Sequence, residues 1–297
     1  MGGFGGALLM SGVAAWLAGC AATPPTPISA PISAPMPASS PASLPGASAQ
    51  SQAAPPPPQP QPHDYAVDAQ LLRISMAHEV PHAVFGDAAD DAGWISRARA
   101  ALAASPYKIA SPQLLVAVDR NPQLQQMRVI LAVPGGQWRV VGGGKVSTGR
   151  RGRKYYYITP TGVFAHDDAI LDYRAEGSFN ENHIRGLGAK GMRVWDFGWQ
   201  VAQKGWHGNG DLGEIRMLMH ATDPAVLEPR LGRPDSMGCV RISAAMNMFL
   251  DRHAVLDADY LQAAKTDPRY AAILPKDGAP SPYAGVYLVI FDSSRPG

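Results

Sequence analysis

A long stretch without charge, residues 21–62, limits where this chain can fold. It holds 14 of the 28 prolines in the 297-residue sequence, and Ala, Ser and Gln make up most of the rest. Such a composition offers almost no apolar surface to bury, so it cannot form a packed core. Proline-rich chain favours extended polyproline II at about 3.1 Å per residue, so this stretch would reach at most ~130 Å. We therefore interpret it as a disordered linker that tethers a globular part beginning at residue 63.

Residues 1–20 have the pattern of a lipoprotein signal peptide. The apolar run 7–17 is about as long as a signal-peptide core and too short to span a bilayer. It leads into Leu-Ala-Gly-Cys20, which resembles a bacterial lipobox and implies lipidation of Cys20. Ala21 follows, and its resemblance to Gram-negative sorting signals implies an outer-membrane anchor with the head in the periplasm. The alternative is a buried apolar helix with an incidental cysteine, since residues 1–6 carry no Lys or Arg.

The charge of the globular part argues against a nucleic-acid partner. All 26 basic and 24 acidic residues fall in residues 63–297, so the two signs nearly balance. Cys239 is the single cysteine of this part, which excludes an internal disulfide. His78 and His82 have the spacing of helical metal ligands, but Pro81 interrupts the helix between them. We expect no metal and no cofactor, and the oligomeric state is left open.

Segment 63–111 is expected to be helical. Apolar residues recur at three- and four-residue spacing in 68–74 and in 91–102, which indicates amphipathic helices. Asp91 is the predicted N-cap of the second helix, and Ser105-Pro106 the predicted end.

From residue 112 onward the pattern predicts a mainly β domain, residues 112–293. The expected strands are the short apolar runs 114–118, 128–133, 137–141, 145–148, 214–219 and 283–291. Gly- and Pro-rich segments between the first four, including the triplet Gly142-Gly143-Gly144, are predicted turns. A helix is expected from residue 244 to about 256, capped by Ser243.

A cysteine and a histidine in this domain could together perform nucleophilic catalysis. His220 closes an apolar segment, and Cys239 follows nineteen positions later beside Gly238. A cysteine attacks carbonyls as the thiolate, so we expect His220 to act as its base and to lower the thiol pKa. The N–H groups near Gly238 could form an oxyanion hole. Taken singly, each residue has a simpler reading, the cysteine as a small buried hydrophobe and the histidine as a structural side chain.

Three separated motifs resemble the L,D-transpeptidase (YkuD-like) catalytic domain. They are His220 followed by Ser-Met-Gly-Cys-Val-Arg at 236–241, Lys-Val-Ser-Thr-Gly at 145–149, and Thr-Pro-Thr-Gly-Val-Phe at 159–164. The resemblance covers roughly residues 112–292, and that family's domain is a mainly β fold. One departure is Met237, which stands where the family usually has histidine.

The resemblance implies a cysteine-dependent acyltransferase acting on peptidoglycan stem peptides. The thiolate of Cys239 would attack the carbonyl of the third residue, usually diaminopimelate, and release the terminal D-alanine. His220 would be the base, and the carbonyl of Ala221 would orient its ring. Ser236, Met237, Gly238 and Arg241 would bind the oxyanion or the substrate; Arg241 could instead form a structural ion pair.

Other functions stay open at this level. An amine acceptor would give cross-linking or protein attachment, whereas water would give an L,D-carboxypeptidase. A non-catalytic peptidoglycan-binding lipoprotein is the alternative that Met237 favours. A zinc peptidase is less consistent with the sequence, because the ligand spacing is missing.

Two further features have competing interpretations. The run Arg-Arg-Gly-Arg-Lys-Tyr-Tyr-Tyr at 150–157 could bind nucleic acid, but a solvated loop at the rim of the cleft fits its length better. Trp195, Trp199 and Trp206 could line a sugar or peptide groove, and we expect them rather to fill a core.

Overall fold

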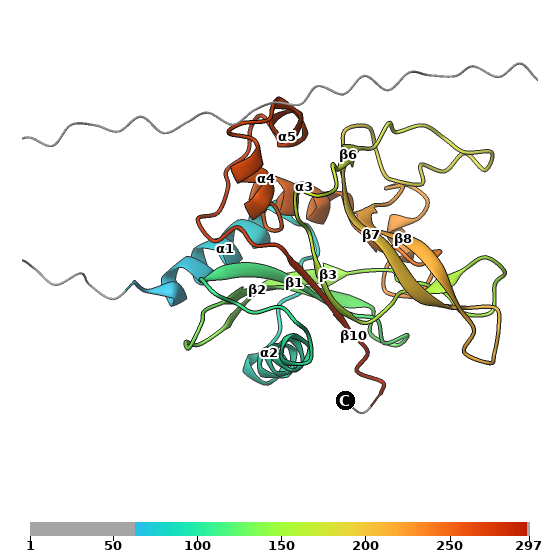
Figure 1. Ribbon diagram of the computed structural model, residues 1–297, viewed down its shortest axis with the longest axis horizontal. Helices are drawn as coiled ribbons and strands as arrows, with labels where there is room; N and C mark the ends of the chain where they lie inside the picture. Colours follow the sequence, from blue (N-terminus) through green and yellow to red (C-terminus); the bar gives the residue numbers. More distant parts are fainter. Residues whose placement is uncertain (1–62, 296–297) are drawn as a thin grey trace, which may run out of the picture. The chain divides into compact units, whose positions relative to one another are not determined.

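The computed structural model describes residues 63–295 (Figure 1). The expected signal peptide 1–20, the lipidated Cys20 and the linker 21–62 lie outside the described residues. The described chain is mainly β, with a helical N-terminal segment and a helix just after Cys239, as predicted. Its strands form two mixed sheets. None of its helices has the length and apolar character needed to cross a membrane.

The first sheet has five strands and is covered on both faces. Its order is β3 (Arg139–Lys145), β2 (Gln126–Ala132), β1 (Gln113–Asp119), β10 (Tyr287–Phe291) and β5 (Gly162–Ala165), with only β1 and β10 parallel. Strands β1 and β2 are buried on both faces, so they read as nearly continuous apolar runs. The last strand, β10, begins at Tyr287, four residues later than the sequence predicts.

The second sheet carries the predicted site. It consists of β4 (Tyr157–Ile158), β7 (Arg193–Lys204), β8 (Leu212–Ala221) and β9 (Val240–Ile242), and β6 (Tyr173–Arg174) pairs with the first part of β7. Strands β7 and β8 form an antiparallel hairpin, joined by a turn over residues 205–211. Strand β9 runs parallel to β8.

Helices pack on both sides of the first sheet. Helix α2 (Ala88–Ala103) buries Trp94, Ala98 and Leu102 against one face. Helix α1 (Tyr65–Glu79) packs on the other face, in a core that also holds α3 (Ala244–Arg252) and one face of the second sheet. Figure 1 shows α1 and α2 on opposite sides of the first sheet. The shorter helices are η1 (Glu228–Arg230), α4 (Ala258–Ala263) and α5 (Pro268–Ile273).

The glycine triplet at 142–144 is not a turn but lies inside β3, contrary to the sequence prediction. Gly143 pairs with Arg128 of β2, and a Cβ there would meet the Met127 carbonyl oxygen at 1.8 Å. Gly142 has a φ of 150° and lies against Met76 and Phe85. The glycines thus permit close approach between β3 and its neighbours, which a turn prediction from composition overlooks.

Two helix N-caps were predicted from the sequence, and one of them lies at a different residue in the structure. The N-cap of α2 is Asp87, not Asp91, and its carboxylate accepts hydrogen bonds from the N–H groups of Ala89 and Asp90. Ser243 caps α3 as predicted, with its hydroxyl accepting from Met246 N–H, but α3 ends four residues earlier than expected.

Candidate active site

Parallel pairing of β8 with β9 places Cys239 and His220 on one face of the second sheet. In this register Met219 lies opposite Val240, and His220 lies opposite Arg241. Met219 and Val240 belong to the hydrophobic core. Side chains alternate along a strand, so His220, Cys239 and Arg241 all lie on the face away from that core. Cys239 and His220 are therefore diagonal neighbours on adjacent chain segments.

The His220 imidazole is held in one tautomer. Its ring is buried, and Nδ1 lies 2.5 Å from the Ala221 carbonyl oxygen. A carbonyl can only accept, so Nδ1 carries the proton and the neutral ring keeps a lone pair on Nε2. Burial lowers the pKa of His220 to about 4, with the charge of Arg241 acting in the same direction. At neutral pH His220 is thus an uncharged base.

The Cys239 thiol has a raised pKa, so the expectation that it is lowered is wrong. Burial of the sulfur raises the pKa most, and the Asp196 carboxylate acts in the same direction. The backbone of Leu218 and the charge of Arg241 oppose them by favouring the thiolate. Because His220 is neutral, no imidazolium is present to lower the thiol pKa. The pair therefore rests as thiol and imidazole.

The three motifs of the sequence analysis meet beneath the Cys239 turn. Ser147 and Arg241 exchange two backbone hydrogen bonds, and Gly149 forms a parallel bridge with Ser236. The buried hydroxyl of Thr159 donates to the Gly238 carbonyl at 2.7 Å and accepts from Gly149 N–H at 2.8 Å. Segments 147–149, 159 and 236–241 thus form one hydrogen-bonded unit.

Gly238 is required by packing within this turn. Its φ is 133°, and a Cβ would meet Ile215 Cδ1 at 2.8 Å. Its N–H donates to Ser236 Oγ at 3.1 Å, and that hydroxyl donates to the Cys239 carbonyl at 2.6 Å. Gly238 N–H and the Ser236 hydroxyl therefore maintain the turn and are not free for substrate.

Two predicted oxyanion donors remain after this correction. Within residues 63–295, the N–H groups of Met237 and Cys239 have no hydrogen-bond acceptor. The Met237 side chain is 51% exposed, while its carbonyl accepts from Tyr157 N–H. The turn thus uses only the backbone of Met237.

Within the part of the chain that the structure describes, Arg241 forms no ion pair. Its Nη1 donates to the Asp235 carbonyl oxygen at 3.0 Å, while the Asp235 carboxylate pairs with Arg230 at 2.6 Å. Its Nε is buried without a partner in the described chain. Burial lowers its pKa from the ordinary arginine value, and its charge acts on both Cys239 and His220.

Strands β6, β7 and β8 add further side chains to this face, and of these the sequence analysis singled out Trp199 alone. Asp196 lies opposite Leu218 and binds Arg216, with Oδ2 and Nη2 2.8 Å apart. Trp199, 65% exposed, lies opposite Arg216 and under its guanidinium. The phenol of Tyr173 has a pKa raised by burial, then by Asp196 and Cys239. The alternating polarity of β7 could have indicated this polar face.

The three tryptophans divide between the two predicted roles. Trp195 is fully buried in the core, whereas Trp199 is exposed on the Cys239 face. Trp206 packs its ring edge-on against Tyr157 at 5.2 Å, in the loop after β7. The predicted packing role is therefore correct for Trp195, whereas the exposed ring of Trp199 is accessible to a ligand.

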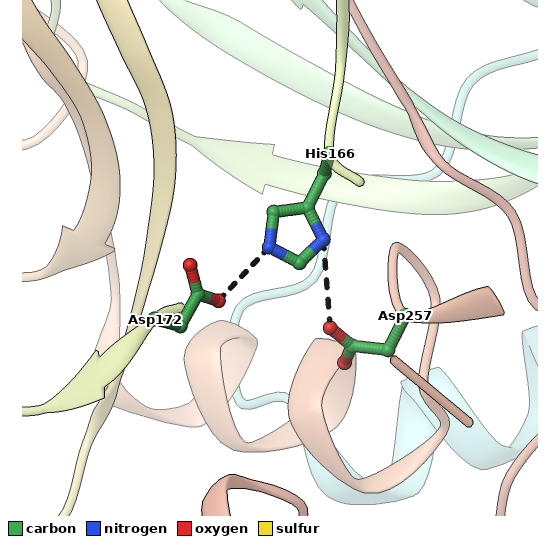
Figure 2. Close-up of side chains that lie close together, drawn as sticks. All are labelled: His166, Asp172 and Asp257. Atoms are coloured by element: carbon green, nitrogen blue, oxygen red, sulfur yellow. Dashed lines mark hydrogen bonds and ion pairs between the residues drawn. The ribbon is translucent and has the colours of Figure 1, made fainter. Parts of the chain in front are cut away.

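A buried cluster behind β7 has a metal-like arrangement. His166, Asp172 and Asp257 bring ligand atoms within 4.8 Å of one another (Figure 2). The sequence analysis missed it because these residues lie on three separate segments. The Arg193 guanidinium, however, lies 2.8 Å from both carboxylates, with Nε on Asp172 and Nη2 on Asp257. A permanent cation thus neutralises the carboxylates that a metal would need, and we interpret the cluster as an ion-pair network.

The network also supports the candidate site. Asp172 accepts from His166 Nε2 and Arg193 Nε with one oxygen, and from Asp196 N–H at 2.9 Å with the other. Its carboxylate raises the pKa of His166 against the effect of burial, and their pairing lowers the pKa of Asp172. The buried Asp172 carboxylate, which is held by Arg193, therefore fixes the backbone from which Asp196 projects.

No protein-family model matches the chain, and no curated protein matches it. Among solved structures, it is similar to a fused zinc-dependent amidase/peptidase with a peptidoglycan-binding domain from Clostridium acetobutylicum ATCC 824. The identity is 14% and the TM-score 0.27, and the match covers 70% of this chain and 64% of that one, just under two thirds of its length. At this TM-score the likeness carries no argument about fold or function.

We expect Arg193→Met to destabilise the protein by about 3–5 kcal/mol, because the buried Asp172 and Asp257 would lose the permanent cation that lies between them. Urea unfolding measures the change. The exposed Arg252 offers a matched control, since Arg252→Met should leave the free energy of unfolding within ~0.5 kcal/mol. A wild-type protein stabilised by added Zn²⁺, with Arg193→Met as stable as wild type, would contradict the ion-pair interpretation.

Proposed function

We propose that this chain is a cysteine-dependent acyltransferase of the L,D-transpeptidase type, acting on peptidoglycan stem peptides. The observation that carries the proposal is the convergence of the three motifs around Cys239, with His220 on the neighbouring strand. The Nδ1 bond to Ala221 supports it further, because it leaves Nε2 able to accept a proton.

In the proposed first step, the Cys239 sulfur forms a bond to the substrate carbonyl carbon while its proton moves to His220 Nε2. The resulting imidazolium is stabilised by the carbonyl of Ala221, and the oxyanion accepts from the N–H groups of Met237 and Cys239. Collapse of the tetrahedral intermediate breaks the C–N bond. The D-alanine amine leaves with the proton from His220, and a thioester remains on Cys239.

In the second step an amine attacks the thioester, with His220 taking its proton and returning it to the sulfur. Water in place of the amine gives the L,D-carboxypeptidase outcome. The neutral resting pair requires the thiol proton to leave as the sulfur attacks, because neither a stable thiolate nor an imidazolium precedes substrate. Arg241 acts on both partners of this transfer, because its charge favours the thiolate and disfavours the imidazolium.

A non-catalytic peptidoglycan-binding lipoprotein is the second candidate. Met237 is the feature that favours it, because the family usually has histidine there. The exposed side chain of Met237 and the backbone role of that position favour the enzyme instead.

The decisive experiment follows D-alanine release from a stem tetrapeptide by mass spectrometry, with and without an amine acceptor. We expect Cys239→Ala to abolish release and His220→Ala to lower it by about 10²–10⁴-fold, because the base is lost. The double variant should be little worse than Cys239→Ala, since the residues act as one unit. His207→Ala, which changes an exposed histidine, is the control. Full activity in Cys239→Ala would exclude the proposed nucleophile.

The pH dependence of alkylation tests the resting state of the thiol. Iodoacetamide reacts with the thiolate, so the rate for Cys239 should still rise above pH ~8.5, the usual thiol pKa. Arg241→Met should move the midpoint higher, because a charge that favours the thiolate is lost. Arg252→Met should leave it unchanged. A rate that is already maximal at pH 7 would show a thiolate–imidazolium pair instead.

The location is also a proposal, and it rests on Leu-Ala-Gly-Cys20 at the end of residues 1–20. We expect Cys20→Ala to move the protein from the membrane fraction to the soluble fraction, because the lipidated residue is lost. Cys239→Ala, which changes the other cysteine, should remain with the membranes. Immunoblots of fractionated cells distinguish these results, and an unchanged distribution of Cys20→Ala would contradict the anchor.

A further inference from the structure

A pocket lined by four arginines lies behind the Cys239 turn. Its volume is about 550 Å³, and its charged lining consists of Arg120, Arg150, Arg151 and Arg295 with one carboxylate, Asp292. These residues come from the β1–β2 turn, the loop after Gly149 and the segment after β10. Cys239 and His220 are not part of the lining, so the pocket is separate from the candidate active site.

The positive charge of this pocket is not balanced by its carboxylate. Asp292 lies 3.3 Å from Arg120 and 3.5 Å from Arg295. Arg150 reaches a carboxylate outside the lining, Asp235, at 3.6 Å. Within the described chain, Arg151 has no carboxylate within 4.0 Å. Three guanidinium charges are therefore in excess over the lining carboxylate.

The arginines are close enough to affect one another. Burial lowers the pKa of Arg120, and the charges of Arg295 and Arg151 add to this lowering while Asp292 opposes it. Like charges held around a partly enclosed space destabilise the unliganded protein, and an anion in the pocket would remove that repulsion.

We propose that this pocket binds a phosphate group. Guanidinium groups form paired hydrogen bonds to phosphate oxygens, and a tetrahedral dianion can accept from several arginines that approach from different directions. One carboxylate ligand would be satisfied by a single arginine and would leave the excess charge largely uncompensated. The proposal does not depend on the acyltransferase chemistry at Cys239.

The pocket also divides the basic run at 150–157 into two parts. Arg150 and Arg151 line it, whereas Arg153 lies over the Tyr156 ring at 4.6 Å and Lys154 over the Tyr155 ring at 4.9 Å. The run is thus not one continuous basic stripe. Arg153 is a matched control for Arg151, because it carries the same charge two residues away and outside the lining.

Isothermal titration calorimetry of the full chain with inorganic phosphate tests the proposal at low ionic strength. We expect saturable binding in the wild type and binding weakened about tenfold or more in both Arg151→Gln and Arg295→Gln. Arg153→Gln should bind as the wild type does. Circular dichroism and Cys239 alkylation establish that each variant is folded.

Two further arms identify the source of the phosphate. Glycerol 3-phosphate represents a free phosphate ester, and phosphatidylcholine vesicles with 20% phosphatidic acid represent a lipid headgroup. Binding in either arm that is lost in Arg151→Gln but kept in Arg153→Gln supports the site. Absence of binding in all arms, or equal weakening in Arg151→Gln and Arg153→Gln, would overturn it, since the second result indicates only diffuse charge.

Discussion

The hydroxyl of Thr159 is the interaction on which the arrangement around Cys239 depends. It donates to Gly238 and accepts from Gly149, so one buried side chain joins its own segment to residues ten positions before it and 79 positions after it. A buried hydroxyl with both roles satisfied contributes stability and direction together. Gly149 could not carry a side chain here, since a Cβ would meet the Tyr157 carbonyl oxygen at 1.9 Å. The Cys239 turn is therefore placed by contacts from behind.

Burial determines the protonation states of Cys239 and His220. It lowers the pKa of His220 to about 4 and raises that of Cys239, because the charged form of each loses hydration. A resting thiol reacts slowly with oxidants and stray electrophiles, while a neutral Nε2 is ready to accept its proton. In the proposed reaction, the site would then become nucleophilic only when a carbonyl is in place.

Local patterns in the sequence predicted most helices and strands. The predictions failed where contacts between distant residues determine the structure. The motifs with Ser147, Thr159 and Cys239 were recognisable because each is short and continuous. The position of the glycine triplet in β3 depends on Met127 and Met76, which no local rule includes. The raised pKa of Cys239 and the occupied N–H of Gly238 likewise depend on packing and on side chains that only the fold brings together.

The ion pairs behind β7 explain how a polar face is held in a fixed position. Apolar packing would bury as much surface, but it would not specify the position of one backbone N–H. Asp172 does so, because one of its carboxylate oxygens accepts from Arg193 Nε while the other accepts from the Asp196 N–H. Desolvating these charges costs free energy that an apolar core would not lose. That cost is consistent with a structure in which the position of Asp196, beside Arg216 and Cys239, matters more than maximal stability.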